Sequence, residues 1–125
     1  MAKTRSASEL HHLVAFDQRE EVDRGDGVTV GKWVERFQTR AGFVHLRGGE
    51  TVLADRLQGQ HTQVAFVRSS TKTRQVSTDW RVRDVRSGSF VGDDWRGTEF
   101  NIRDITPTDD RQWLDFLCQS GVASG

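Results

Sequence analysis

The residues best suited to acid–base chemistry are two pairs of adjacent aspartates, Asp93-Asp94 and Asp109-Asp110. Glycoside hydrolysis needs two carboxylates that face each other across the bond being cleaved. Adjacent aspartates among Gly, Ser and Thr are instead typical of solvent-facing turns. We therefore interpret both pairs as turn residues, and they predict no general acid and base.

Metal-ligating residues are few and scattered along the chain. The candidates are His11, His12, His45, His61 and Cys118. A structural zinc site takes four ligands at short spacings, and this chain has no CxxC pair. Neighbouring histidines in a strand point to opposite faces, so they cannot bind one ion together. We predict neither a metal nor a cofactor.

Nucleophile and phosphate-binding motifs are also missing from the sequence. Neither GxxxxGK[ST] nor GxGxxG occurs, so no glycine-rich loop is set to hold a phosphate. Ser89 in "GSFVG" does not match the nucleophile elbow. Cys118 lies in an apolar alternation, which is typical of a buried structural thiol. The sequence therefore predicts a protein that is not an enzyme.

Arg24-Gly25-Asp26 is the tripeptide that cell-surface adhesion receptors bind. The first ten residues carry no apolar run typical of a secretory signal, and no segment reaches the roughly 18 apolar residues of a membrane span. These features favour an intracellular origin. We therefore interpret Gly25-Asp26-Gly27 as a tight turn, because glycine readily adopts the positive φ that such turns need.

The composition favours one domain, residues 1–125, with a core at about residues 9–119 between short flexible tails. Only 34% of the 125 residues are hydrophobic and 29% are charged, so the core must be thin. The single cysteine excludes an intramolecular disulfide. Association with partner subunits is then the expected source of additional stability.

The formal net charge is zero, which is unusual for a protein that acts by neutralising nucleic-acid phosphates. Basic residues nevertheless gather between Arg68 and Arg86. This segment is either a basic surface facing DNA or an acidic neighbour, or a set of solvated strands that pair with one another. We expect Arg81, Arg83 and Trp95 to contact a partner, since an exposed indole usually packs against one.

Hydrophobic patterning and turn residues predict a mainly β protein, a small antiparallel β-barrel or sandwich of five to six strands with one short helix. Strands are expected at about residues 11–21, 28–46, 61–68, 80–86, 98–106 and 111–119, and the helix at residues 50–58.

Three details accompany this prediction. The first strand should be buried on both faces, and the strand at 80–86 only on one. The long apolar segment 28–46 should divide into two strand segments at a bend or bulge near Gly31 or Gly42. Residues 87–97 are expected to be a loop, and Pro107 with Asp109-Asp110 should mark the turn between the last two strands.

The order of these features resembles the bacteriophage head-tail joining proteins, also called head closure, stopper or head-tail adaptor proteins. Four segments carry the resemblance, which spans about residues 9–119. They are "ELHHLVAF" with Leu10, His12, Val14 and Phe16; "DGVTVGKWVE" with Asp26, Gly27 and Trp33; "RAGFVHLRGGE" with Ala41, Phe43, Leu46, Gly48 and Glu50; and "EFNIRDI" followed by "RQWLDFLC". Two departures are a longer segment at residues 86–97 and His45, where the family often has proline.

The resemblance implies a virion protein, assembled in the bacterial cytoplasm, of a tailed phage or a gene transfer agent. Six or twelve copies would form a ring below the portal or adaptor and above the tail terminator or tail tube. This ring would keep packaged DNA in the head without reading its sequence. The segment from about Leu46 to His61 would project toward the channel or the neighbouring ring. The expected interface residues are Leu46, Arg47, Gly48, Gly49, Glu50, Leu53, Arg56 and Leu57.

The alternative function is a small nucleic-acid-binding barrel of the oligonucleotide-binding type, suggested by the basic segment Arg68 to Arg86. It predicts salt-sensitive binding to single strands that weakens when Arg81 and Arg83 are replaced by alanine.

Overall fold

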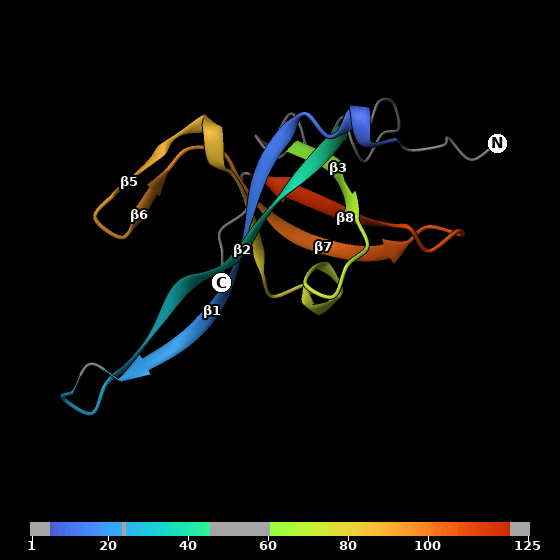
Figure 1. Ribbon diagram of the computed structural model, residues 1–125. Helices are drawn as coiled ribbons and strands as arrows, with labels where there is room; N and C mark the ends of the chain where they lie inside the picture. Colours follow the sequence, from blue (N-terminus) through green and yellow to red (C-terminus); the bar gives the residue numbers. More distant parts are fainter. Residues whose placement is uncertain (1–5, 24, 46–60, 121–125) are drawn as a thin grey trace.

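A six-stranded antiparallel sheet closes on itself into a barrel in the computed structural model, which describes residues 6–23, 25–45 and 61–120 (Figure 1). The neighbours around the barrel follow the order β1-β2-β3-β8-β7-β4, and pairing of β4 with β1 closes it. The prediction of a small antiparallel β-barrel is confirmed. The strands are β1 (His12–Asp23), β2 (Thr29–His45), β3 (His61–Arg68), β4 (Arg81–Asp84), β7 (Glu99–Pro107) and β8 (Trp113–Ser120).

A separate two-stranded hairpin is formed by β5 (Ser89–Val91) and β6 (Asp94–Arg96). The prediction of a loop over residues 87–97 is therefore wrong. Gly92 turns the hairpin with a φ of 63°, which glycine adopts without strain. The remaining helical segments of the described chain are the 3₁₀ turns η1 (Ala7–Glu9), η2 (Thr73–Gln75) and η3 (Val85–Ser87). The helix expected at residues 50–58 lies outside the described residues.

The core fills the barrel with side chains that alternate along each strand. Phe16 lies at its centre, with ring centroids 5.0 Å from Phe37 and 5.2 Å from Phe116. Each buried phenylalanine contributes about 1.5–3 kcal/mol of hydrophobic stabilisation. The core also includes Val14, Val67, Val82, Phe100, Ile102, Leu114 and Cys118. Phe100 and Ile102 therefore share the inner face of β7, and Leu114, Phe116 and Cys118 that of β8.

The first two strands extend beyond the barrel as a two-stranded arm of residues 18–34, at the lower left of Figure 1. Their pairing continues outward to Asp23 and Thr29. The turn that joins them contains Gly25 and Gly27 with φ of 87° and 84°. Asp26 Oδ1 accepts the amide hydrogen of Val28 at 3.1 Å. Gly25-Asp26-Gly27 thus forms a tight turn, as predicted.

A β-bulge sits where the arm leaves the barrel. Phe16 pairs with Phe37 but Asp17 pairs with Glu35, so Arg36 is the extra residue in β2. The predicted division of residues 28–46 near Gly31 or Gly42 is wrong, because β2 is one strand and the irregularity lies at Arg36. The bulge directs Arg36 Nε to Gln18 Oε1 at 3.0 Å and its Nη2 to Glu20 Oε1.

The turn between β7 and β8 confirms the prediction made from Pro107 and Asp109-Asp110. Asp110 Oδ1 accepts hydrogen bonds from Thr108 Oγ1 at 2.6 Å and from the Gln112 amide at 3.0 Å. These two donors lower the pKa of Asp110, because they stabilise the ionised carboxylate. This aspartate pair therefore organises a turn.

Candidate functional site

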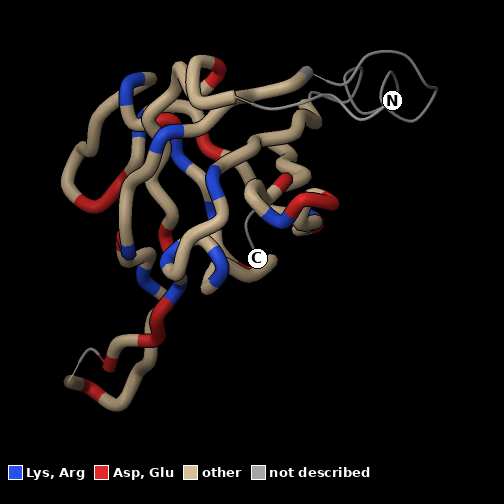
Figure 2. The backbone as a smooth tube through the Cα atoms, turned by 45° about the vertical axis from the view of Figure 1, so that its right-hand side comes forward, with Lys and Arg blue, Asp and Glu red and all other residues tan. Residues whose placement is uncertain are grey.

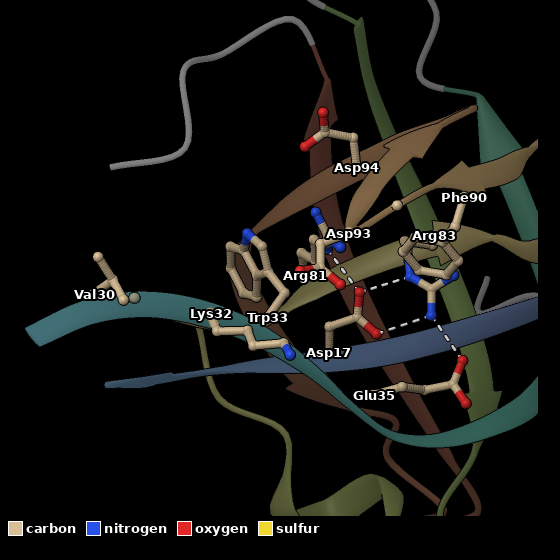
Figure 3. A pocket seen from close by; sticks show the side chains of 12 residues that line it. Asp17, Val30, Lys32, Trp33, Glu35, Arg81, Arg83, Phe90, Asp93 and Asp94 are labelled. Carbon is tan, nitrogen blue, oxygen red and sulfur yellow. Dashed lines mark hydrogen bonds and ion pairs between the residues drawn. The ribbon is translucent and has the colours of Figure 1, made fainter. Parts of the chain in front are cut away.

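A cleft of about 690 Å³ lies on the outer surface of the barrel, where the β5–β6 hairpin stands opposite β2 (Figure 3). Strands β1, β2 and β4 form the floor of the cleft. The β5–β6 hairpin forms the wall opposite β2. The residues that line it are Asp17, Val30, Gly31, Lys32, Trp33, Glu35, Arg81, Arg83, Phe90, Gly92, Asp93 and Asp94.

Two arginines share one buried carboxylate on the floor of this cleft. Asp17 Oδ2 accepts from Arg81 Nε at 2.7 Å and from Arg83 Nε at 2.6 Å, and Asp17 Oδ1 accepts from Arg83 Nη2 at 3.1 Å. The side chains of Asp17, Arg81 and Arg83 are only 2%, 10% and 2% exposed. We call these three residues the ion-pair cluster.

The strand register explains how residues more than sixty positions apart form this cluster. Asp17 lies directly opposite Arg81, and Ala15 opposite Arg83, in the β1–β4 pair. Side chains alternate between faces, so Asp17, Arg81 and Arg83 point away from the barrel core. The prediction that the strand at residues 80–86 is buried on only one face is wrong, because the β5–β6 hairpin covers the outer face of β4 as well. The predicted burial of β1 on both faces is confirmed for residues 14–17.

Glutamates on the adjoining strands complete the pairing. Arg83 Nη2 donates to Glu35 Oε1 at 2.7 Å, and Arg81 Nη1 donates to Glu99 Oε2 at 2.8 Å. Burial alone would lower the pKa of Arg83, but hydrogen bonds and charge from Asp17 and Glu35 outweigh it and raise that pKa. Arg83 is therefore held in its charged form, and both guanidiniums are paired with carboxylates of their own chain.

Aromatic rings stack on the two guanidiniums and fix the hairpin against the barrel. The Arg81 guanidinium carbon lies 4.7 Å from the Trp33 ring centroid. That of Arg83 lies 4.7 Å from the ring of Phe90 and 4.9 Å from the ring of Trp95. Such cation–π contacts are worth about 0.5–2 kcal/mol each, depending on burial. The hairpin is thus held by Arg83, one of the two arginines that neutralise Asp17.

The residues expected to contact a partner, Arg81, Arg83 and Trp95, contact residues of their own chain in the structure. Arg81 and Arg83 donate to carboxylates of their own chain. Trp95 is half-buried, and its Nε1 donates to the Thr98 carbonyl at 3.1 Å. The expected ring interface at residues 46–57 lies outside the described residues.

Sequence reasoning missed the partners of these arginines, namely Asp17, Glu35 and Glu99, as well as the stacking role of Trp33. One signal was available: Asp17 directly follows the apolar run "LVAF" in a strand expected to be buried. An ionised aspartate in such a strand needs a cationic partner. The basic strand "RVR" was the obvious source.

Asp17 accepts three hydrogen bonds from guanidinium donors, and the described residues that line the cleft include no serine, threonine or cysteine. Within residues 6–23, 25–45 and 61–120, no three His, Cys, Asp or Glu side chains are grouped as metal ligands. Cys118 lies elsewhere, in the core, and burial raises the pKa of its thiol to about 12.

No helix among the described residues has the length and apolar character needed to cross a membrane.

The model of the phage head completion protein family matches residues 5–121, which is nearly the whole chain. The chain belongs to the phage head completion protein family. Its resemblance to phage head closure proteins is thereby confirmed. Membership places it among the structural proteins of phage heads.

Two solved structures share the fold of this head completion protein. The solution structure of protein SF1141 from Shigella flexneri 2a is 15% identical, with a TM-score of 0.63, and the match covers 94% of this chain and 97% of that one. A chain in the virion of a native gene transfer agent particle is 16% identical, with a TM-score of 0.57 and coverage of 90% and 96%. No curated protein sequence matches significantly.

Proposed function

We propose that the protein is a subunit of the connector ring that closes the DNA-filled head below the portal and joins it to the tail. The observation that carries this proposal is the family match over residues 5–121. A chain of a gene transfer agent virion has the same fold, which makes such a particle a second setting for the same role.

The shape of the molecule supports a role that depends on neighbours. An isolated two-stranded hairpin is marginally stable in water, yet the arm extends from the barrel without a third strand among the described residues. Val22, Val28 and Val30 are 40%, 47% and 37% exposed near its tip. Val22 and Val30 are direct cross-strand partners, so they share one face. Contact with an adjacent subunit would cover this face.

The charge distribution suits a ring through which DNA passes. The net charge is zero, and the most buried arginines are neutralised internally. The arm tip carries Glu20, Glu21, Asp23 and Asp26, seen as red segments at the lower left of Figure 2. An acidic, protruding surface repels phosphates, so we assign the arm to contacts with protein and propose that DNA is retained without sequence recognition.

Residues 46–57 stay our proposed ring or channel interface, and a ring of six or twelve copies stays the proposed assembly. The portal or an adaptor ring would lie above it, and the tail terminator or tail tube below. Assembly would take place in the bacterial cytoplasm.

Deletion of the gene in a strain that produces the particle tests this role. We expect heads that have packaged DNA, fail to retain it and carry no tails in negative-stain images, with rescue by the gene supplied in trans. Tailed, DNA-filled particles from the deletion strain would overturn the proposal.

We propose no nucleic-acid-binding function. The alternative is suggested by the basic segment Arg68 to Arg86 and would be tested at Arg81 and Arg83, whose guanidiniums are bound by Asp17, Glu35 and Glu99. Cations neutralised in this way contribute little to phosphate binding.

A further inference from the structure

One edge of β2 is open along most of its length. Its inner edge pairs with β1 from Thr29 to Ala41, and β3 pairs with it only from Gly42 to His45. Within the described part of the chain, no strand pairs with the outer edge over residues 29–41. In an antiparallel strand, every second residue directs its N–H and C=O to the outer edge. This edge therefore presents main-chain groups that a further strand can bond.

The cleft follows this edge. Four successive residues of β2 line it, from Val30 to Trp33. Gly31 has no side chain, so the cleft meets the main chain of β2 at this position as well as the side chains of its neighbours. Figure 3 shows Val30, Lys32 and Trp33 along β2, with Phe90, Asp93 and Asp94 on the hairpin side.

The accessible charges on the walls are mainly acidic. The two arginines of the floor are buried in the ion-pair cluster, where Arg83 also pairs with Glu35, whereas Asp93 and Asp94 are exposed on the hairpin, with Arg96 Nη2 3.8 Å from Asp94 Oδ2. Lys32 is the one exposed cation among the residues that line this cleft. The exposed carboxylates thus outnumber the exposed cation, which favours a positively charged occupant. The ring of Phe90, also exposed, offers an apolar contact at the same place.

We propose that this groove binds an extended, lysine- or arginine-containing segment of a partner protein, which adds a strand to the free edge of β2 beneath the β5–β6 hairpin. The main chain of the segment bonds the edge over residues 30–33. Its cationic side chains reach Asp93 and Asp94, and its apolar side chains pack on Phe90 and Trp33. This is strand addition, in which the main chain supplies affinity and alternate side chains supply specificity. The inference goes beyond the ring role and does not depend on it.

The test uses the ¹⁵N-labelled full chain and the peptide acetyl-KVKVKV-amide. We expect saturable shifts of the amides of residues 29–35 and 90–94, and calorimetric binding that weakens as salt is added. Two versions of the peptide, N-methylated at the odd or at the even residues, separate strand addition from simple charge attraction. One of the two should lose binding, because its methyl groups replace the hydrogens that bond the edge.

The variant D93N/D94N should bind the peptide about fivefold more weakly, as expected for two partly exposed ion pairs. The matched control is D109N/D110N, which removes an equal charge from the distant β7–β8 turn and should leave affinity unchanged. Acetyl-EVEVEV-amide should not bind.

Four results would overturn the inference. The first two are failure of the lysine peptide to bind and shifts only of amides outside this groove. The other two are N-methylated peptides that both bind as tightly as the parent, and an equal loss of peptide affinity in D93N/D94N and D109N/D110N. Shifts of the same amides produced by raising the protein concentration alone would also overturn it, because the occupant would then be a second copy of this chain.

Discussion

Asp17 is the residue on which the outer half of the fold depends. It lies at the end of the buried part of β1, at the β-bulge, and holds two arginines from β4. Those arginines in turn stack with rings from β2 and from the β5–β6 hairpin. One carboxylate therefore connects three segments that are far apart in sequence.

Replacement of the Asp17 carboxylate should lower the free energy of unfolding strongly. Asp17→Ala leaves two buried guanidiniums without their shared partner, and breaking a buried ion pair from one side costs about 3–5 kcal/mol. We expect a loss of that size in the free energy of unfolding measured in urea, with a smaller loss for Asp17→Asn, which keeps an acceptor oxygen. The control is Glu20→Ala, which breaks the exposed pair with Arg36 and should cost less than about 1 kcal/mol. Equal losses for Asp17→Ala and Glu20→Ala would contradict this account of the cluster.

Cys118 gives a pH-dependent prediction. Burial raises the pKa of its thiol from 9.0 to about 12, so below pH 9 the thiol is protonated in both the folded and the unfolded state. Between pH 9 and about 12 the unfolded state ionises first, so the free energy of unfolding should fall as pH rises. A Cys118→Ala variant should lack this part of the pH dependence.

The same burial should protect the thiol from reagents. At pH 8 we expect negligible reaction of the folded protein with a disulfide reagent and full reaction in denaturing urea. Rapid labelling of the folded protein would show that Cys118 is accessible.

At the scale of elements, local patterns were sufficient for the barrel strands and their turns. Apolar alternation predicted the strands around Phe16, Phe66, Phe100 and Phe116, and glycine or proline marked the connections. Two of the three errors concern contacts that are distant in sequence, and the third concerns a local hairpin that packs on the strand just before it. Burial of Arg81 and Arg83 depends on Asp17, which is 64 and 66 positions away. The position of the bulge at Arg36 depends on the register between β1 and β2. The β5–β6 hairpin is held in place by stacking on Arg83.

Glycines at two positions of β2 should respond differently to substitution, because their surroundings differ. A Cβ at Gly42 would collide with the ring of buried Phe66, whereas one at Gly31 would meet only the flexible end of Arg19. Gly42→Ala should therefore destabilise the barrel by about 1–3 kcal/mol, as overpacking does. Gly31→Ala should change the free energy of unfolding by less than about 0.5 kcal/mol. Chemical denaturation of both variants checks this, and equal effects would show that the Gly42 contact is relieved by movement.

At the scale of the whole molecule, the barrel supplies a rigid body from which two hairpins project. The upper left of Figure 1 shows β5–β6, and the lower left shows the arm. Composition had predicted a thin core that needs neighbours, and the exposed valines of the arm are a place where a neighbour can pack. The ring interface expected at residues 46–57 stays a prediction, since it lies outside the described residues.

The valine face of the arm can be tested separately from the barrel. Val22→Ser with Val30→Ser should weaken assembly into rings while leaving the thermal midpoint within about 2 °C, because both residues lie on the exposed arm, outside the barrel core. The matched control places serines on the opposite face, at Glu21 and Thr29, and should assemble normally. Analytical ultracentrifugation distinguishes the two, and equal assembly by both variants would exclude the valine face from the interface.

The central claim is that this protein is a ring-forming connector subunit. Native mass spectrometry of the purified chain, alone and mixed with the portal complex of the same particle, tests it most directly. We predict a complex whose added mass equals six or twelve copies of the 14.2 kDa chain. Free monomer in both samples, with the portal mass unchanged, would contradict the claim.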